Sequence, residues 1–419
     1  MGTIAEKIIT DKLNRDVTPG EIIQLPVDLA FGHDVTLPPA ITAFDRLDVD
    51  SVFDPDRVAV IPDHLVPAHS EYAAELYTAC KEFAETHGTV FYPQGTQGQE
   101  HVVIPEDGLV KPGDVMVGAD SHSCTEGAMG VYSLGVGSTD LAFAMAFGWI
   151  WARIPETIRI NYVGDPGDWV SGKDLALTTV SELGVDGAVY KALELGGPAI
   201  RDLSMDDRFT LSNMAIEAGA ATGIVEPDET TAAFADSHCD GEYTFYTPSP
   251  DATYSETVTI DCSGLEPQVA VPNLPENAQP VSSVQAAGIE IDQAVIGSCT
   301  NGRRSDLETA AEILDGETVA DDVRLIITPG SQDLEQESIE EGWTATFLEA
   351  NATLENPGCG ACFGMRTGVL DEDEIAVSTT NRNFTGRMGA PSSDVYLASP
   401  AVAAASAVAG EIVHPTEVA

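Results

Sequence analysis

The chain has 419 residues, with 68 acidic and 19 basic side chains and a formal net charge of −49 at pH 7. So negative a surface repels nucleic-acid phosphate and acidic membrane surfaces, which argues against binding either of them. The apolar content of 43% is that of a globular protein and argues against disorder. An acid-rich chain with six lysines suggests a halophilic protein, because strong salt screens the self-repulsion; the alternative is an ordinary acidic protein.

The chain length favours two or three domains, and short apolar strands that alternate with helix-like segments favour α/β layers. Thr3 is expected to cap a helix through about Arg15, and residues 140–151 are expected to form a buried helix. A strand over 157–163 is predicted to open a second domain, and the proline-rich stretch 271–280 is the best candidate for a linker. We therefore expect domains at 1–154, 155–280 and 281–419.

No apolar run is long enough to span a bilayer, and the N-terminal residues lack the pattern of a secretion signal. We therefore expect a cytoplasmic protein, a location that suits free thiols.

Polar residues follow two predicted strands of the N-terminal domain. The strand at 58–61 ends at Asp63 and His64, and the strand at 114–118 ends at Asp120 and His122. Ligand groups gather beyond the carboxyl ends of parallel strands, so these four residues are candidates for a site. An aspartate beside a histidine can fix its tautomer and raise its basicity, although His64 could equally be a core histidine. The nearby pair at 33–34 reads more simply as a local hydrogen bond at a turn.

Three cysteines of the C-terminal domain have the spacing of a metal site. Cys359 and Cys362 lie three positions apart among glycines, and Cys299 follows an apolar strand, before a helix whose capping box is expected at 305–308. Three thiolates match three irons of a [4Fe-4S] cube and leave the fourth iron open. A zinc site, a redox pair or a simple buried thiol at 299 are the alternatives.

Arginines gather beside the same three segments. Six arginines follow Arg208, and five of them lie in or next to these motifs: Arg303, Arg304, Arg366, Arg382 and Arg387. Guanidinium groups bind carboxylates through two parallel hydrogen bonds, which indicates a site for an anion with several carboxylates. For Arg304 and Arg366, pairing with neighbouring acids is an equally good explanation.

Five separated segments together resemble the aconitase superfamily of iron–sulfur hydro-lyases. They are 61–64 (IPDH), 118–122 (GADSH), 297–301 (GSCTN), 358–364 (GCGACFG) and 380–387 (TNRNFTGR). The resemblance covers nearly the whole chain and is strongest to the compact form typical of archaea. It implies three α/β/α domains around the cleft of a [4Fe-4S] cluster and no C-terminal swivel domain.

The resemblance also assigns roles to individual residues. It implies that Asp63 and His64 form the acid pair and that Cys299, Cys359 and Cys362 hold the cluster. The further catalytic candidates are His101, Asp120, His122 and Glu217. The candidates for binding substrate and surrounding the cluster are Arg382, Arg387, Arg303 and Asn213. By spacing alone, Asn213 and Glu217 would be a solvated pair on one helix face.

The implied reaction is a dehydration and rehydration that moves a hydroxyl between adjacent carbons of a branched 2-hydroxy diacid. We expect isomerisation of 2-isopropylmalate and 3-isopropylmalate in leucine biosynthesis, with homoaconitate, citrate and 2-methylmalate as rival substrates. A small subunit that carries the swivel domain is expected as partner. The alternative from another class, a metal-regulated nucleic-acid-binding protein, is disfavoured by the net charge.

Overall fold

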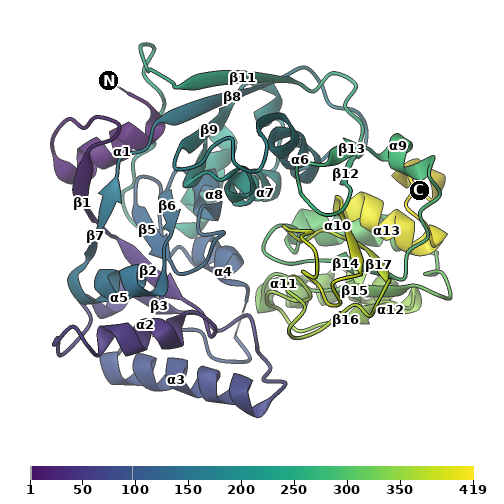
Figure 1. Ribbon diagram of the computed structural model, residues 1–419, viewed down its shortest axis with the longest axis horizontal. Helices are drawn as coiled ribbons and strands as arrows, with labels where there is room; N and C mark the ends of the chain where they lie inside the picture. Colours follow the sequence, from purple (N-terminus) through teal and green to yellow (C-terminus); the bar gives the residue numbers. More distant parts are fainter. Residues whose placement is uncertain (1, 97) are drawn as a thin grey trace. The chain divides into compact units, whose positions relative to one another are not determined.

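The computed structural model describes residues 2–96 and 98–419 and divides into two compact units. Unit 1 comprises Met1–Tyr162 and Gly187–Ile260, and unit 2 comprises Val163–Asp186 and Asp261–Ala419 (Figure 1). Among the described residues, no helix has the length and apolar composition needed to cross a membrane. The domain boundaries expected at 154 and 280 stay a prediction.

Unit 1 is built on a parallel sheet of five strands in the order β4-β3-β2-β5-β6. The strands are β2 (Leu29–Gly32), β3 (Val58–Val60), β4 (Val90–Phe91), β5 (Val115–Gly118) and β6 (Tyr132–Gly135). β2, β3 and β5 are buried along their whole length, as expected for central parallel strands covered on both faces. The helices of this region are α1 (Ile4–Leu13), α2 (Leu37–Phe44), α3 (Glu71–His87), α4 (Glu100–Glu106) and α5 (Ser138–Phe147).

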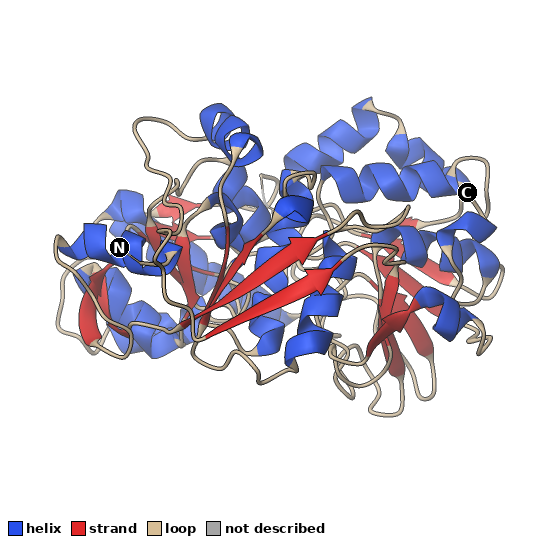
Figure 2. Cartoon of the chain, turned by 90° about the horizontal axis from the view of Figure 1, so that it is seen from above, coloured by secondary structure: helices blue, strands red, loops and turns tan. Residues whose placement is uncertain are grey.

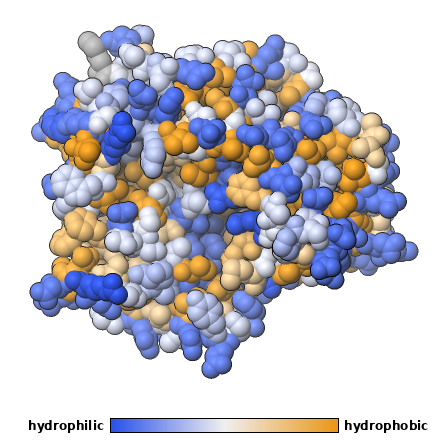
Figure 3. All heavy atoms as spheres, viewed as in Figure 1, coloured by the Kyte–Doolittle hydropathy of each residue, from blue (hydrophilic) through white to orange (hydrophobic). Residues whose placement is uncertain are grey.

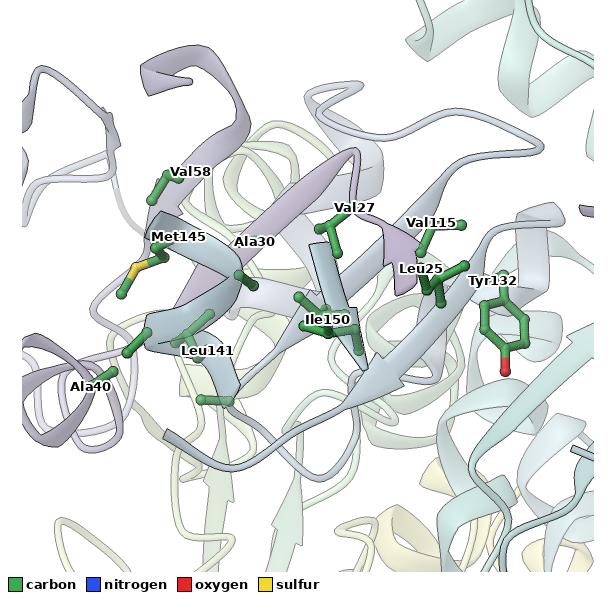
Figure 4. Close-up of a cluster of buried hydrophobic side chains, with 14 of the residues drawn as sticks. Leu25, Val27, Ala30, Ala40, Val58, Val115, Tyr132, Leu141, Met145 and Ile150 are labelled. Atoms are coloured by element: carbon green, nitrogen blue, oxygen red, sulfur yellow. The ribbon is translucent and has the colours of Figure 1, made fainter. Parts of the chain in front are cut away.

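An apolar core packs against this sheet. Ala30, Val58 and Val115 of the sheet lie in one cluster with Leu141 and Met145 of α5 (Figure 4). The expected N-terminal helix is confirmed as α1, with a capping box between Thr3 and Glu6.

The buried helix expected over 140–151 is shorter than predicted. α5 ends at Phe147, because Gly148 adopts the left-handed conformation with φ of 71° and closes the helix. Residues Trp149–Arg153 then form β7, which pairs antiparallel with β1 (Ile22–Pro26).

A second sheet has the order β10-β9-β8-β11. Its strands are β8 (Thr157–Val163), which confirms the strand expected there, β9 (Ala192–Gly196), β10 (Thr222–Val225) and β11 (Glu256–Asp261). The helical segments nearby are η2 (Thr125–Met129), η3 (Pro198–Ile200), α7 (Met205–Asn213), η4 (Met214–Ala218) and α8 (Glu229–His238). Near the N-terminal end of β3 lies η1 (Pro55–Arg57).

Unit 2 contains a sheet of seven strands in the order β13-β12-β18-β17-β14-β15-β16. The five strands from β18 to β16 are parallel, and β12 runs antiparallel to both of its neighbours. The strands are β12 (Gln268–Ala270), β13 (Ala278–Pro280), β14 (Gln293–Ile296), β15 (Arg324–Ile327), β16 (Thr353–Leu354), β17 (Ile375–Ser378) and β18 (Asp394–Leu397). Helices pack around these strands (Figure 2). They are α6 (Gly172–Leu183), α9 (Val281–Gln285), α10 (Arg304–Leu314), α11 (Gln332–Glu340), α12 (Trp343–Glu349), α13 (Pro400–Ala409) and η5 (Pro415–Glu417).

Two expectations for unit 2 need correction. The stretch 271–280 is no plain linker, because its end forms β13 and pairs with β12 at the edge of the sheet. The helix α10 begins at Arg304, and its N-terminal cap is closed by Asp306, whose carboxylate accepts the N–H of Arg303 at 2.9 Å. The capping box expected at 305–308 is therefore two residues too late.

Candidate active site

Unit 1 contains three histidine–carboxylate pairs beside the carboxyl end of its parallel sheet. The strands of this sheet are labelled in Figure 1. The members of the pairs come from segments far apart in sequence: the loop after β3, the start of α4, the loop after β5, and η4. The pairs are His64 Nδ1 with Asp63 Oδ1 (2.5 Å), His101 Nε2 with Asp120 Oδ1 (2.9 Å), and His122 Nε2 with Glu217 Oε1 (3.0 Å). The structure thus brings together all six residues that the sequence offered as catalytic candidates.

Asp120 connects the pairs to one another. Its Oδ1 also accepts the backbone N–H of His122 at 2.7 Å, and its Oδ2 lies 4.0 Å from His64 Nε2. Burial alone would raise the pKa of this carboxyl, but hydrogen bonds from His101 and His122 and their charges hold it well below its ordinary value. Asp120 is therefore an anion at the centre of the cluster.

The two histidines that face most negative charge are held protonated. Burial lowers the pKa of His64, but the charge and hydrogen bond of Asp63 outweigh it and raise this pKa to about 9. His101 behaves in the same way: burial opposes protonation, yet hydrogen bonds to Asp120 and Glu126 raise its pKa to about 9. At neutral pH both rings are imidazolium ions that can donate protons.

His33 and Asp34 contribute more than the local turn expected from the sequence. Asp34 accepts the backbone N–H groups of Asp63 (3.2 Å), His64 (3.0 Å) and Leu65 (2.7 Å), so it fixes the loop that carries the acid pair. The ring of His33 stacks on that of His64 with centroids 3.8 Å apart. Burial and the neighbouring His64 charge lower the pKa of His33 to about 3, which keeps its ring neutral.

Glu126 is a site residue that the sequence reasoning missed. Its Oε1 lies 3.4 Å from His101 Nδ1, on the side of the ring opposite Asp120. Gly127, next to it, packs so closely that a Cβ there would lie 1.8 Å from the carbonyl oxygen of Gly223. The segment of Glu126 therefore packs directly against β10, in which Gly223 lies.

Asn213 and Glu217 do not share one continuous helix. α7 ends at Asn213, and Glu217 lies on the 3-10 turn η4 that follows. Asn213 Nδ2 donates to Thr125 Oγ1 at 2.9 Å, which fixes it to the segment of Glu126. Both side chains are buried, so the alternative of a solvated pair is wrong.

Unit 2 gathers the three candidate cysteines in loops that follow its parallel strands. Cys299 lies just beyond β14, and all three thiols are nearly buried. Asn381, which follows β17, has its Oδ1 3.6 Å from Cys299 Sγ and 3.5 Å from Cys362 Sγ. The two sulfurs are therefore no farther apart than the sum of these distances. Asn381 lies inside a recognised motif, but its role between two thiols was not predicted.

The cysteine loops meet the conditions for a thiolate-ligated cluster. All seven cysteines, each within the described residues, are free thiols. Gly360 has φ of 63°, and a Cβ there would lie 2.8 Å from Thr328 Oγ1 in the loop after β15. Only glycine fits this close turn between Cys359 and Cys362. Buried thiols beside glycine turns at one sheet edge fit a three-cysteine ligand set.

The arginines near these loops divide into two groups. Arg304 pairs with Glu308 and Glu337, and Arg366 pairs with Glu355. For these two arginines the simpler explanation, pairing with neighbouring acids, is confirmed. Arg387, in contrast, donates from Nε to the carbonyl oxygen of Cys362 (2.9 Å) and from Nη2 toward its sulfur (3.5 Å). Arg303 is buried at the start of α10, and Arg382 is half-buried next to Asn381.

A second set of possible metal ligands occurs in unit 1. Ligand atoms of His33, Asp34, Asp63 and His64 lie within 4.8 Å of one another in the described part of the chain. Asp34 uses both oxygens on backbone N–H groups, and Asp63 uses both on His64 and on the N–H of Glu100. These groups are therefore better explained as a hydrogen-bonded acid site than as a metal centre.

The model of the aconitase family (aconitate hydratase) matches residues 6–410, and the chain therefore belongs to this family. It is an enzyme of the hydro-lyase class. The 3-isopropylmalate dehydratase large subunit of Moorella thermoacetica is 51% identical over 418 residues, which cover 99% of both chains. Large subunit 1 of the same enzyme from Pyrococcus furiosus is also 51% identical, and the large subunit from Halothermothrix orenii is 49% identical, each with 99% coverage of both chains.

A solved structure supports the fold. The holo-form of aconitase X from Thermococcus kodakaraensis superposes with a TM-score of 0.52 at 13% identity, covering 91% of this chain and 89% of that one. At this identity the likeness shows the aconitase-type α/β fold alone. The aconitase-type α/β fold expected from the sequence is thus confirmed, and the three domains around a cluster cleft stay a prediction.

Proposed function

We propose that the chain is the large, catalytic subunit of a 3-isopropylmalate dehydratase, which interconverts 2-isopropylmalate and 3-isopropylmalate in leucine biosynthesis. The observation that carries the proposal is the set of three buried or part-buried histidine–carboxylate pairs in unit 1 of a chain that is about half identical to such subunits over its full length. The thiols of Cys299 and Cys362, which both lie beside the Asn381 side chain in unit 2, support it.

Cys299, Cys359 and Cys362 would hold a [4Fe-4S] cluster. With one iron left without a cysteine ligand, the cluster would supply Lewis acidity toward the oxygens of the substrate. Arg387, which donates to both the carbonyl and the sulfur of Cys362, would keep this loop in place.

His64 is the proposed proton donor. Its Nδ1–H bonds Asp63 at 2.5 Å, which leaves the proton on Nε2 for the departing hydroxyl oxygen. Its pKa of about 9 keeps this proton in place at neutral pH. His101, with Asp120 and Glu126, supplies a second imidazolium ion, and Glu217 orients His122.

Arg382 and Arg387 are proposed to bind the substrate carboxylates through paired hydrogen bonds, with contributions from Arg303 and Asn213. The base that removes the carbon-bound proton is proposed to be a serine of a separate small subunit that carries the swivel domain. Activity should then require both subunits, and the missing subunit would contribute much of the substrate choice. Hydrophilic residues are spread over the face seen in Figure 3, with hydrophobic ones between them. The complex is proposed to be a cytoplasmic, salt-adapted heterodimer.

The test is turnover by the complex. The chain is co-expressed with its small subunit, reconstituted anaerobically with iron and sulfide in high salt, and offered each diacid in turn. The conjugated product of dehydration is followed by its ultraviolet absorbance. We expect turnover of the isopropylmalates. A preference for homoaconitate, citrate or 2-methylmalate would reassign the substrate, and salt-dependent RNA binding without any turnover would overturn the enzyme assignment.

A further inference from the structure

Lys173 is a fully buried lysine at the first turn of α6, in the segment Val163–Asp186 that belongs to unit 2. Its Nζ donates two hydrogen bonds of 2.7 Å, one to the carbonyl oxygen of Thr379 and one to that of Thr380. These carbonyls lie just beyond β17, more than 200 positions further along the chain. The next residue is Asn381, which contacts the sulfurs of Cys299 and Cys362.

One of these two threonines, Thr379, also secures the loop of Cys299. Thr379 Oγ1 accepts the N–H of Gly297 at 2.9 Å and donates to its carbonyl oxygen at 3.0 Å. Thr300 Oγ1 donates to the carbonyl oxygen of Thr379 at 2.7 Å, so this oxygen receives both Thr300 and Lys173. Lys173 therefore fixes a residue, Thr379, that is hydrogen-bonded to Gly297 before Cys299 and to Thr300 after it.

The ammonium group is not needed to attach α6. Asp174, the next residue, already caps the helix through Ser171 and accepts the backbone N–H of Gln268 at 2.7 Å. Burying an ammonium ion is costly unless its hydrogen bonds are satisfied, and a methionine would fill the same space without that cost. A charge at this position therefore indicates a role in the loop that it contacts.

We propose that Lys173 is a positioning residue for the cysteine cluster. By fixing the carbonyls of Thr379 and Thr380, it sets the side-chain amide of Asn381 and, through it, the sulfurs of Cys299 and Cys362. The inference rests on the proposed function only in naming the cluster as the ligand, because the arrangement of the thiols can be tested in the metal-free chain.

The experiment compares Lys173→Met with Lys81→Met, a substitution of the same type at a half-exposed lysine of α3. The metal-free chains are treated with iodoacetamide under native conditions, and alkylation of each cysteine is timed by peptide mass spectrometry. Because two hydrogen bonds from a charged donor are lost, Cys299 and Cys362 of Lys173→Met should react about tenfold faster or more. Cys262, a buried thiol of unit 2 outside these loops, serves as the internal control for opening of the whole unit.

Three outcomes are possible. Faster alkylation of Cys299 and Cys362 with Cys262 and Lys81→Met unchanged supports the proposal. An equal increase in alkylation rate at Cys262 would mean that Lys173 merely stabilises unit 2. Unchanged rates at all three thiols would mean that Lys173 does not position the cysteine loops. Either result overturns the proposal. After reconstitution, Lys173→Met should also lose its visible cluster absorbance to a chelator several-fold faster, and equal loss rates would contradict the assigned role.

Discussion

Replacing Asp63 by asparagine should disable the proposed proton donor and leave the fold in place. The amide can keep its oxygen toward the N–H of Glu100, which Asp63 Oδ2 now accepts at 2.9 Å. Its NH₂ group then faces His64 Nδ1 as a donor, in place of an accepting carboxylate. His64 loses both the charge that raises its pKa and the hydrogen bond that places the proton on Nε2.

The size of the effect follows from the pKa of His64. The rise from the ordinary 6.5 to about 9 corresponds to about 3 kcal/mol in favour of the imidazolium ion. At pH 8, a group with a pKa of about 9 is about nine-tenths protonated, whereas one at 6.5 is about 3% protonated. Turnover at pH 8 should therefore fall about thirtyfold from protonation alone, with a further loss from the wrong tautomer.

The assay is the pH dependence of kcat/KM for dehydration by the reconstituted complex, because this quantity reports the pKa values of the free enzyme. Wild type should lose activity as pH rises through about 9, and Asp63→Asn should lose it at least two pH units lower. Asp50→Asn, at an exposed aspartate, is the matched control and should follow wild type. A folded Asp63→Asn enzyme that keeps the alkaline limit near 9 would refute the assignment of His64.

The raised pKa of His64 also makes the free energy of unfolding depend on pH. A histidine whose pKa is raised in the folded state stabilises the fold fully below its unfolded value of about 6.5, and this contribution disappears as pH rises through about 9. The wild-type free energy of unfolding should therefore decrease between these pH values by more than that of Asp63→Asn, as measured by urea denaturation.

Three further substitutions test other parts of the site. Cys299→Ser should abolish turnover with every diacid and cluster binding with it, whereas Cys239→Ser should retain both in metal analysis and assay; an active Cys299→Ser enzyme would refute the ligand assignment. Glu217→Gln should lower kcat about a hundredfold, because His122 loses its orienting carboxylate, with little change in melting temperature; an unchanged kcat would remove this pair from the site. Gly127→Ala should reduce the free energy of unfolding by about 3 kcal/mol, since its Cβ meets a backbone carbonyl. Gly137→Ala should cost little, because a Cβ there would meet only Asp140 Oδ2 at an ordinary distance of 3.9 Å. Similar urea midpoints for the two alanine variants would contradict the close packing.

Much of the fold and of the site could be predicted because the relevant signals are local. Apolar strands that run directly into Asp63–His64 and Asp120–His122 mark the carboxyl edge of a parallel sheet, and the structure brings these residues together. A cysteine pair set among glycines likewise predicts a tight turn in which two thiols can face one metal centre.

The supporting contacts could not be predicted because they join distant segments. Asp34 braces a loop about 30 positions away, and Lys173 contacts a strand end more than 200 positions away. No spacing rule connects such residues before the sheets are formed. The end of the helix expected over 140–151 was wrong for a different reason. A continuous apolar run cannot tell a helix from a buried strand, and only Gly148 marks the change from α5 to β7.

The partners of the C-terminal arginines were likewise not predictable from the sequence. Five of them cluster near the C-terminal motifs, yet Arg304 and Arg366 form ion pairs with acids, and Arg387 contacts Cys362. Charge clustering in the sequence drew attention to these segments, but only the structure distinguishes Arg304 and Arg366, which pair with acids, from Arg387, which contacts Cys362.

Iron and sulfide analysis of the anaerobically reconstituted chain tests the central claim most directly. If Cys299, Cys359 and Cys362 hold the proposed cluster, the wild-type chain will contain about four irons and four sulfides, and replacing any of the three by serine will lower both. A chain that retains zinc alone, or that binds iron equally well without these thiols, would contradict the account.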